Sequence, residues 1–225
     1  MHDQPRAVRL HIEIVRIAIT RRRDAHEPGR LEALVELPGA AELAGLALVC
    51  HPHPQQGGTM NNKVAHTLAR AFYRSGFGAL RFNFRGVGKS DGEYDEARGE
   101  LADALACIDY LQNRWPDKKL WISGFSFGAA IAIRAAALRQ PAGLVSIAPA
   151  VYRFANNLDV QPDCPWLIVH GDEDELVPID ETIEWVNALD PGPELEVFAQ
   201  TSHFFHGKLN ELREAVMDFV AANSD

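Results

Sequence analysis

Cysteine, basic residues and long apolar runs are all scarce in this chain of 225 residues. Its three cysteines, Cys50, Cys107 and Cys164, are widely spaced, which excludes a disulfide framework and gives no zinc-ligand spacing. Reduced thiols of this kind are typical of a cytoplasmic protein. Lys and Arg number 22 against 31 Asp and Glu, and the resulting net charge of −9 argues against a nucleic-acid partner.

The apolar segments of the chain are short. None approaches the roughly 18 uninterrupted apolar residues of a membrane span, so the sequence predicts no membrane partner. Residues 1–6 lack the apolar core of a signal peptide. The length and the ordinary hydrophobic content of 47% predict a single domain over residues 1–225.

Strand and helix patterns alternate along most of the chain. Segments 8–20 and 31–37 read as half-exposed antiparallel strands. From residue 46 onward, apolar runs typical of strands buried on both faces alternate with amphipathic stripes typical of helices. The predicted strands are 46–50, 78–82, 120–123, 143–147, 166–170 and 194–199, and the predicted helices are 61–75, 101–111, 129–138, 178–189 and 209–220. This alternation predicts an α/β fold, with a mostly parallel central sheet of about eight strands flanked by helices.

The string Gly124-Phe125-Ser126-Phe127-Gly128 lies between a predicted strand and a predicted helix. In that setting Gly-x-Ser-x-Gly is the nucleophile-elbow pattern, in which a tight turn projects the serine hydroxyl. A serine hydroxyl is a weak nucleophile until a base takes its proton. The elbow therefore predicts a histidine and an orienting carboxylate further along the chain, in the order serine, acid, histidine.

Three histidines follow the elbow: His170, His203 and His206. His170 ends a predicted strand too early to follow an acid of this kind, whereas His203 follows the last predicted strand, with His206 as its rival. A dense acidic loop comes directly after the strand 166–170. Its candidate orienting acids are Asp172, Glu173 and Asp174.

Four motifs in register resemble the α/β-hydrolase superfamily over nearly the whole chain. They are the elbow, the acid loop His170-Gly171-x-x-Asp174-x-x-Val177-Pro178, the histidine loop Ser202-His203-Phe204-Phe205, and the turn Arg85-Gly86-Val87-Gly88-Lys89-Ser90-Asp91-Gly92. The segment His51-Pro52-His53-Pro54 is similar to the oxyanion loop of small lidless bacterial serine hydrolases, which are related to dienelactone-hydrolase and acyl-peptidase-like esterases. The resemblance implies an α/β-hydrolase fold and a triad without cofactor or metal, in which Ser126 is the nucleophile, Asp174 the acid and His203 the base.

An oxyanion hole needs two backbone donors. One is expected to be the N–H of Phe127, directly after the nucleophile. Pro52 and Pro54 have no N–H, which favours the amide of His53 between them, with residues 55–58 as alternatives.

Two further residues are expected to support this loop. His51 is expected to hydrogen-bond the loop and shape the pocket. Arg85 is expected either to brace the loop carbonyls or to pair with Asp91 or Glu93. Although His51 and His53 form a His-x-His pair, no carboxylate is near them in the sequence, which argues against a metal site.

Too few residues separate the strand 143–147 from residue 165 for the lid domain that many α/β-hydrolases insert there. The sequence therefore predicts an open, shallow site rimmed by aromatic side chains. These are Phe125, Phe127, Tyr152, Phe154 and Phe204.

An open apolar rim suits short to medium acyl groups. The favoured function is cleavage of small acyl esters or thioesters through an acyl-enzyme intermediate. An acyl-peptide hydrolase, a C–C bond hydrolase and a non-catalytic binding protein of the same fold are the alternatives. An exposed edge strand near the end of the chain could pair in a homodimer.

Overall fold

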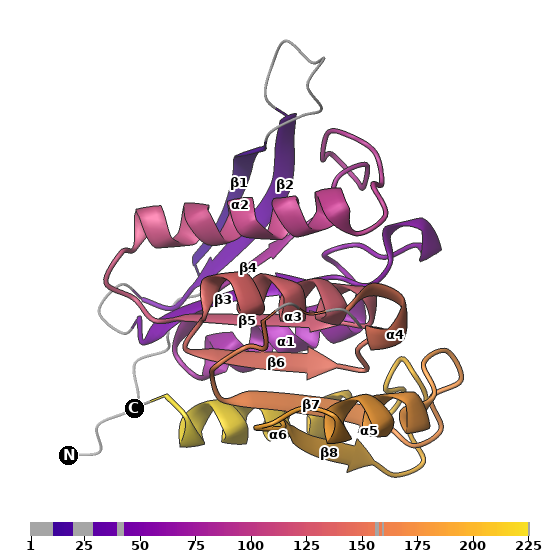
Figure 1. Cartoon of the computed structure of the whole chain (residues 1–225). Helices are drawn as coiled ribbons and strands as arrows, with labels where there is room; N and C mark the ends of the chain where they lie inside the picture. The colour runs from indigo at the N-terminus through magenta and orange to yellow at the C-terminus, as the bar shows by residue number, and fades with distance from the viewer. Residues whose placement is uncertain (1–10, 20–28, 40–42, 156–157, 159, 225) are drawn as a thin grey trace, which may run out of the picture.

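The structure is a computed structural model that describes residues 11–19, 29–39, 43–155, 158 and 160–224. Its strands form one sheet in the order β1-β2-β4-β3-β5-β6-β7-β8 (Figure 1). β1 and β2 pair antiparallel, as do β2 and β4, and all other neighbours are parallel. The strands are β1 (His11–Ile19), β2 (Gly29–Leu37), β3 (Gly45–Cys50), β4 (Phe77–Phe82), β5 (Leu120–Phe125), β6 (Gly143–Ile147), β7 (Trp166–Gly171) and β8 (Glu194–Phe198). The predicted fold class is confirmed.

Helices cover both faces of the sheet, which is why its central strands are buried on both sides. In β3, Leu46 and Leu48 pack into one core while Ala47 and Val49 pack into the other, as the alternation of side chains along a strand requires. α2 (Arg98–Arg114), α3 (Phe127–Arg139) and α5 (Ile179–Asn187) line the first core, and α1 (Lys63–Arg74) and α6 (Leu209–Ala222) line the second (Figure 1).

The connection from β6 to β7 contains one short helix, α4 (Val151–Phe154), among its described residues. The carboxyl ends of the parallel strands are therefore left without a lid domain, as predicted. Because loops that follow parallel strands gather at one edge of the sheet, those after β3, β4, β5, β7 and β8 surround a common site.

The observed element boundaries around the elbow differ from the predicted ones by up to two residues. The structure extends β5 to Phe125 and begins α3 at Phe127, whereas the apolar pattern ends the strand at residue 123 and begins the helix at residue 129. The predicted first strand is described as His11–Ile19, and its remaining residues, like residues 1–6, lie outside the described residues. Within the described residues, no helix is long and apolar enough to cross a membrane. The single domain over residues 1–225 stays a prediction.

β8 is the edge strand that could pair in a homodimer. It carries Glu194 and Glu196, with Asp218 of α6 close to the latter. Charges of one sign on an edge strand oppose strand addition by a second copy. The homodimer stays a prediction.

Candidate active site

Ser126 alone forms the turn between β5 and α3. Its φ of 57° and ψ of −117° are strained for a residue with a side chain, and such strain clusters at functional sites. The flanking glycines make the turn sterically feasible. A Cβ on Gly124 would lie 2.3 Å from the carbonyl oxygen of Gly128, and a Cβ on Gly128 would lie 2.3 Å from that of His51. The backbone thus has the strand–turn–helix geometry that the motif predicts.

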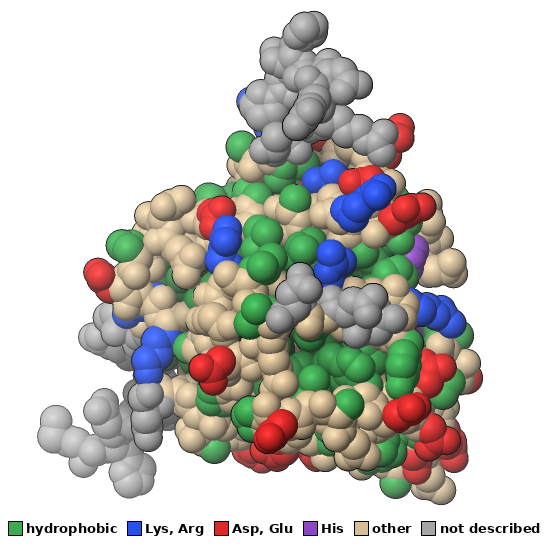
Figure 2. Space-filling view, in the orientation of Figure 1, with side chains coloured by type: hydrophobic (Ala, Val, Ile, Leu, Met, Phe, Trp, Pro, Cys, Tyr) green, Lys and Arg blue, Asp and Glu red, His purple; other side chains and the backbone are tan. Residues whose placement is uncertain are grey.

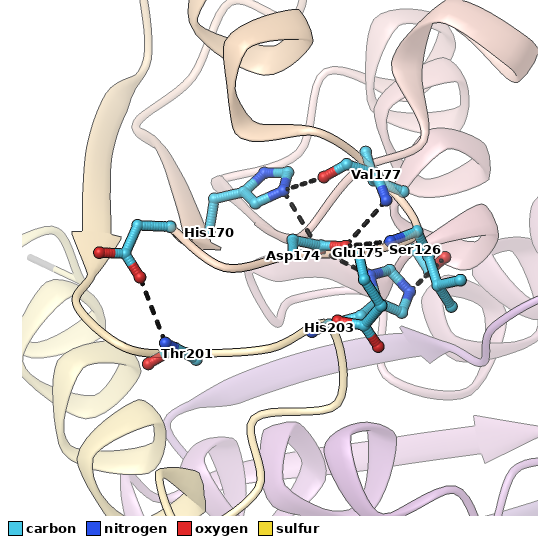
Figure 3. A network of polar contacts seen from close by, with 9 residues as sticks. Ser126, His170, Asp174, Glu175, Val177, Thr201 and His203 are labelled. Carbon is cyan, nitrogen blue, oxygen red and sulfur yellow. Dashed lines mark hydrogen bonds and ion pairs between the residues drawn. The ribbon is translucent and has the colours of Figure 1, made fainter.

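The side chains of Ser126, His203 and Asp174 form one hydrogen-bonded chain (Figure 3). His203 Nε2 lies 3.0 Å from Ser126 Oγ, and His203 Nδ1 lies 2.7 Å from Asp174 Oδ2. An ionised carboxylate only accepts, so Nδ1 carries the proton and donates to Asp174. Nε2 is then the acceptor for the serine hydroxyl, which is the arrangement that a general base requires.

The carboxylate of Asp174 receives four donors. The N–H groups of Leu176 and Val177 donate to Oδ1 at 2.9 and 2.8 Å, and His203 and His170 reach Oδ2 at 2.7 and 3.2 Å. Burial alone would raise the pKa of Asp174, but hydrogen bonds from His170, His203 and Val177 hold this pKa well below its usual range. Asp174 is therefore ionised at neutral pH.

His170 is a site residue that the sequence analysis missed. It is fully buried, and its Nε2 lies 2.9 Å from the carbonyl oxygen of Val177 and 3.2 Å from Asp174 Oδ2 (Figure 3). Both partners accept, so Nε2 carries the proton and His170 is a second imidazole donor to the acid. Its spacing of four residues before Asp174, across a tight loop, is the signal that could have identified it.

The rival candidates have other contacts. Asp172 Oδ1 accepts a hydrogen bond from the N–H of Thr201, which ties the acid loop to the histidine loop, and Glu173 is exposed. His206 is exposed, and its ring lies 6.1 Å from that of Phe204. None of these three side chains hydrogen-bonds to Ser126 or His203.

On the other side of the elbow, the loop after β3 packs closely against α3. Phe127 is the first residue of α3, and the N–H groups of a first helical turn have no partner within the helix. The amide of Gln55 donates to His53 Nδ1, and those of Gln56 and Gly58 donate to the His53 carbonyl. Three of the four alternative oxyanion donors are thus engaged elsewhere.

His51 hydrogen-bonds the loop after β3 and the residue that follows Asn83. Its Nε2 accepts a hydrogen bond from the N–H of Phe84 at 3.0 Å, so Nδ1 carries the proton and donates to the Pro52 carbonyl at 2.6 Å. The same loop is held further along by two residues that the sequence analysis missed. Arg81 donates to the Met60 carbonyl at 2.6 Å, and Asn83 accepts from the Met60 N–H at 2.8 Å.

Both predicted partners of Arg85 are wrong. Its guanidinium pairs with Asp103 of α2, with Nη2 and Oδ1 2.6 Å apart, and its N–H donates to the same carboxylate at 2.9 Å. The physical reason is that Asp103 is fully buried and requires a counter-charge. Gly99 makes room for it, since a Cβ there would lie 2.2 Å from Arg85 Nη1. Arg85 supports the loop after β4, and the oxyanion loop depends on other residues.

The predicted aromatic rim is only partly correct. Phe125 is fully buried, because its ring packs against those of His203 and Phe204 at 4.9 and 6.0 Å, and it is not a rim residue. Phe127 is also buried. Phe204 is 39% exposed and borders the site beside His203.

Phe154 and Tyr152 are the last two residues of the predicted rim, and only Phe154 packs against the site wall. Phe154 is half-buried, and its ring lies 4.9 Å from that of Phe127 and 5.7 Å from that of His53. Tyr152 lies on the other side of α4, beside Glu184 of α5. Tyr94 is a further site residue that the sequence analysis missed. Its hydroxyl lies 3.3 Å from His53 Nε2.

Burial of His51 makes the stability of the fold sensitive to acid. It lowers the pKa of His51 from 6.5 to about 4. Between these two pH values the unfolded chain binds a proton that the folded chain does not, so stability falls as the pH drops. As the pH falls from neutral to about 4, we expect protonation of His51 in the unfolded chain to lower the free energy of unfolding by up to about 3 kcal/mol.

His51→Gln tests this contribution, since the glutamine oxygen can still accept from Phe84 while the side chain no longer titrates. Denaturant unfolding between pH 7.5 and 4.5 should show a shallower loss of stability in this variant than in the wild type. Equal losses in the two proteins would contradict the assignment.

Comparison with known proteins agrees with the fold. A family model described as Hydrolase_4, serine aminopeptidase S33, matches residues 56–158. An uncharacterized protein of Rickettsia prowazekii is 35% identical over 188 residues, with 79% of each chain covered. An α/β serine hydrolase homologue from Coxiella burnetii is 44% identical with a TM-score of 0.81, covering 84% of this chain and 91% of that chain. A serine hydrolase without a lid from Xanthomonas campestris is 39% identical with a TM-score of 0.83, covering 93% of this chain and 94% of that chain.

A mostly parallel sheet with helices on both faces, and with a strained serine at the end of its central strand, defines an α/β-hydrolase. Several relatives exceed 30% identity over most of their length. The chain therefore belongs to the α/β serine hydrolases that lack a lid domain.

Proposed function

We propose that this protein cleaves carboxylic esters or thioesters of small acyl substrates through an acyl-enzyme on Ser126. The observation that carries the proposal is the continuous hydrogen-bonded chain from Ser126 through His203 to an ionised Asp174, with contacts of 3.0 and 2.7 Å. A serine beside a neutral imidazole, itself oriented by a carboxylate, is the arrangement that activates a hydroxyl for acyl transfer.

In the first half-reaction, Ser126 Oγ attacks the acyl carbonyl carbon while its proton moves to His203 Nε2. Asp174 stabilises the imidazolium that forms. The carbonyl oxygen becomes an oxyanion, which accepts hydrogen bonds from the N–H groups of Phe127 and His53. His203 then protonates the leaving oxygen or sulfur, the bond to the carbonyl carbon breaks, and the acyl group remains on Ser126.

In the second half-reaction, water replaces the leaving group. His203 takes a proton from the water as it attacks the acyl carbon, and the second oxyanion forms in the same hole. Collapse of this intermediate releases the carboxylic acid and returns the proton to Ser126. Apart from the attacking water, both half-reactions use only groups of the protein.

Charge near His203 favours leaving groups without negative charge. The acid loop and α5 lie on the side of Ser126 from which His203 comes, and Figure 2 shows acidic side chains gathered at the lower right of the molecule. The exposed acidic residues of this region are Asp172, Glu173, Glu175, Asp180, Glu181 and Glu184. Their field repels an anionic leaving group such as coenzyme A.

Two thioesters with the same reacting bond test this preference. Butyryl-N-acetylcysteamine is neutral, whereas butyryl-coenzyme A carries phosphates. We expect kcat/KM to be about fivefold or more higher for the neutral thioester at low salt, with the gap narrowing in 0.5 M NaCl as charges are screened. A preference for the coenzyme A thioester that weakens with salt would contradict this assignment of the leaving-group side.

A cytoplasmic location is part of the proposal. It is supported by the cysteines, which are all free: Cys50 and Cys107 are buried and Cys164 is half-buried.

A further inference from the structure

Tyr94 and His53 form a polar pair on the wall of the site beside the elbow. Tyr94 Oη lies 3.3 Å from His53 Nε2, and the two ring centres are 5.0 Å apart. Both rings lie over Phe127, with centroid distances of 6.1 Å from Tyr94 and 4.9 Å from His53. The ring of Phe154 completes this wall at 5.7 Å from His53. Among these apolar and aromatic faces, the Tyr94 hydroxyl is a polar group without an assigned role.

The hydrogen bonds determine which atom of this pair carries a free proton. The N–H of Gln55 donates to His53 Nδ1 at 3.2 Å, so in the neutral ring Nε2 carries the proton. His53 Nε2 therefore donates to Tyr94 Oη, and Tyr94 is the acceptor. Its own O–H proton has no acceptor among the described residues, which leaves it available to a bound molecule.

The protonation states of both groups agree with this assignment. Burial, followed by the charge of Arg153, lowers the pKa of His53, so the ring is neutral at neutral pH. Burial, followed by Glu100 and Glu96, raises the pKa of Tyr94, so the phenol keeps its proton.

The backbone around Tyr94 is fixed by contacts from α2 and α3. The N–H of Asp95 donates to the carboxylate of Glu100, which is fully buried, and Arg134 donates to the Ala97 carbonyl, both at 2.9 Å. Between these anchors, Glu96 and Ala97 have φ values of 50° and 66°, which non-glycine residues rarely adopt. Two consecutive strained residues persist only where the surrounding contacts hold them, so Tyr94 is positioned rather than loosely placed.

The wall faces the acyl part of a substrate. β3 and β4, whose loops carry His53 and Tyr94, lie on one side of β5 in the sheet, whereas β7 and β8, whose loops carry Asp174 and His203, lie on the other. In ester cleavage the leaving oxygen must face His203, which protonates it. The acyl chain then extends away from His203, toward His53, Tyr94 and Phe154.

We propose that Tyr94 is a specificity-determining residue whose hydroxyl donates a hydrogen bond to an oxygen atom within the acyl group. The site therefore favours short acyl esters that carry an ether or oxo oxygen over wholly aliphatic ones of the same length. This inference rests on the proposed function, because it assumes an acyl group on Ser126.

Tyr94→Phe tests the proposal, since it removes only the hydroxyl and keeps the ring in the wall. Three p-nitrophenyl esters of equal chain length serve as substrates: pentanoate, ethoxyacetate and 3-methoxypropanoate, in which an oxygen replaces the third or fourth carbon. Intrinsic differences in reactivity cancel when the kcat/KM ratio of each oxygenated ester to pentanoate is compared between variant and wild type. Tyr110→Phe is the matched control, because that hydroxyl accepts a hydrogen bond from Arg114 near the C-terminal end of α2.

We expect Tyr94→Phe to lower this ratio about fivefold for at least one oxygenated ester, as the loss of one hydrogen bond predicts. Tyr110→Phe should leave every ratio unchanged. An equal loss of kcat/KM on all three esters would mean that the hydroxyl only positions the loop. No change of kcat/KM on any ester would mean that the hydroxyl contacts no substrate. Either result overturns the proposal. If wild type cleaved none of the esters while fluorophosphonate failed to label Ser126, the proposed function itself would fail, and this inference with it.

Discussion

Ser126→Ala should lower kcat for p-nitrophenyl butyrate by about 10⁴- to 10⁶-fold. The variant lacks the oxygen that attacks the acyl carbon, while the oxyanion donors and His203 remain. Alanine and serine both carry an unbranched Cβ, so the strain at the φ of 57° is similar, and the fold and the melting temperature should change little. Residual turnover would report what binding and the oxyanion hole provide without a nucleophile.

Ser202→Ala is the matched control for this prediction. Ser202 precedes His203 in the histidine loop, and its backbone carbonyl accepts a hydrogen bond from the N–H of Phe205. The control should stay within about twofold of wild type, since substitutions away from critical contacts have small effects. Normal turnover by Ser126→Ala would refute the acyl-enzyme mechanism and favour a non-catalytic binding protein.

The second prediction concerns Asp174→Asn, for which we expect kcat to fall by about 10³- to 10⁴-fold with little change in KM. In the wild type, Asp174 Oδ1 accepts from the N–H groups of Leu176 and Val177. The asparagine oxygen must occupy that position, because its NH₂ group cannot accept. The NH₂ group then faces His203 Nδ1, which has to become an acceptor.

This change places the proton of neutral His203 on Nε2, where it faces Ser126 Oγ and cannot remove the hydroxyl proton. The NH₂ group also meets the N–H of His170, so the variant should lose some stability. Glu173→Gln is the control, because Glu173 is exposed and belongs to the same acidic loop. If the Glu173 variant lost activity while the Asp174 variant kept normal activity, Glu173 rather than Asp174 would be the orienting acid.

The nucleophile turn could be predicted from sequence because its constraint is local. Gly124 and Gly128 are needed where backbones approach too closely for a Cβ, and that requirement leaves a five-residue pattern in the chain. The order of Ser126, Asp174 and His203 followed from the resemblance to a family with a fixed order. The alternation of apolar runs was sufficient for the sheet, since a strand buried on both faces differs in composition from a half-exposed one.

The partners of buried charges could not be predicted in this way. Arg85 pairs with Asp103 because Asp103 lies on the face of α2 that packs against the loop after β4. No local sequence pattern predicts which face of α2 packs there. The contribution of His170 depends on a hydrogen bond formed across a loop. The position of Tyr94 depends on the positive φ values of Glu96 and Ala97, and such φ values are hard to predict from sequence at residues other than glycine. The burial of Phe125 follows from the exact end of β5, which the apolar pattern placed at residue 123.

The central claim is that Ser126 is the nucleophile activated by His203. Its most direct test is mass spectrometry of the intact protein and its peptides after reaction with a fluorophosphonate. Wild type should gain one phosphonyl group, located on the peptide that contains Ser126, and Ser126→Ala should gain none. Absence of labelling in folded wild type, or a label on another residue, would contradict the claim.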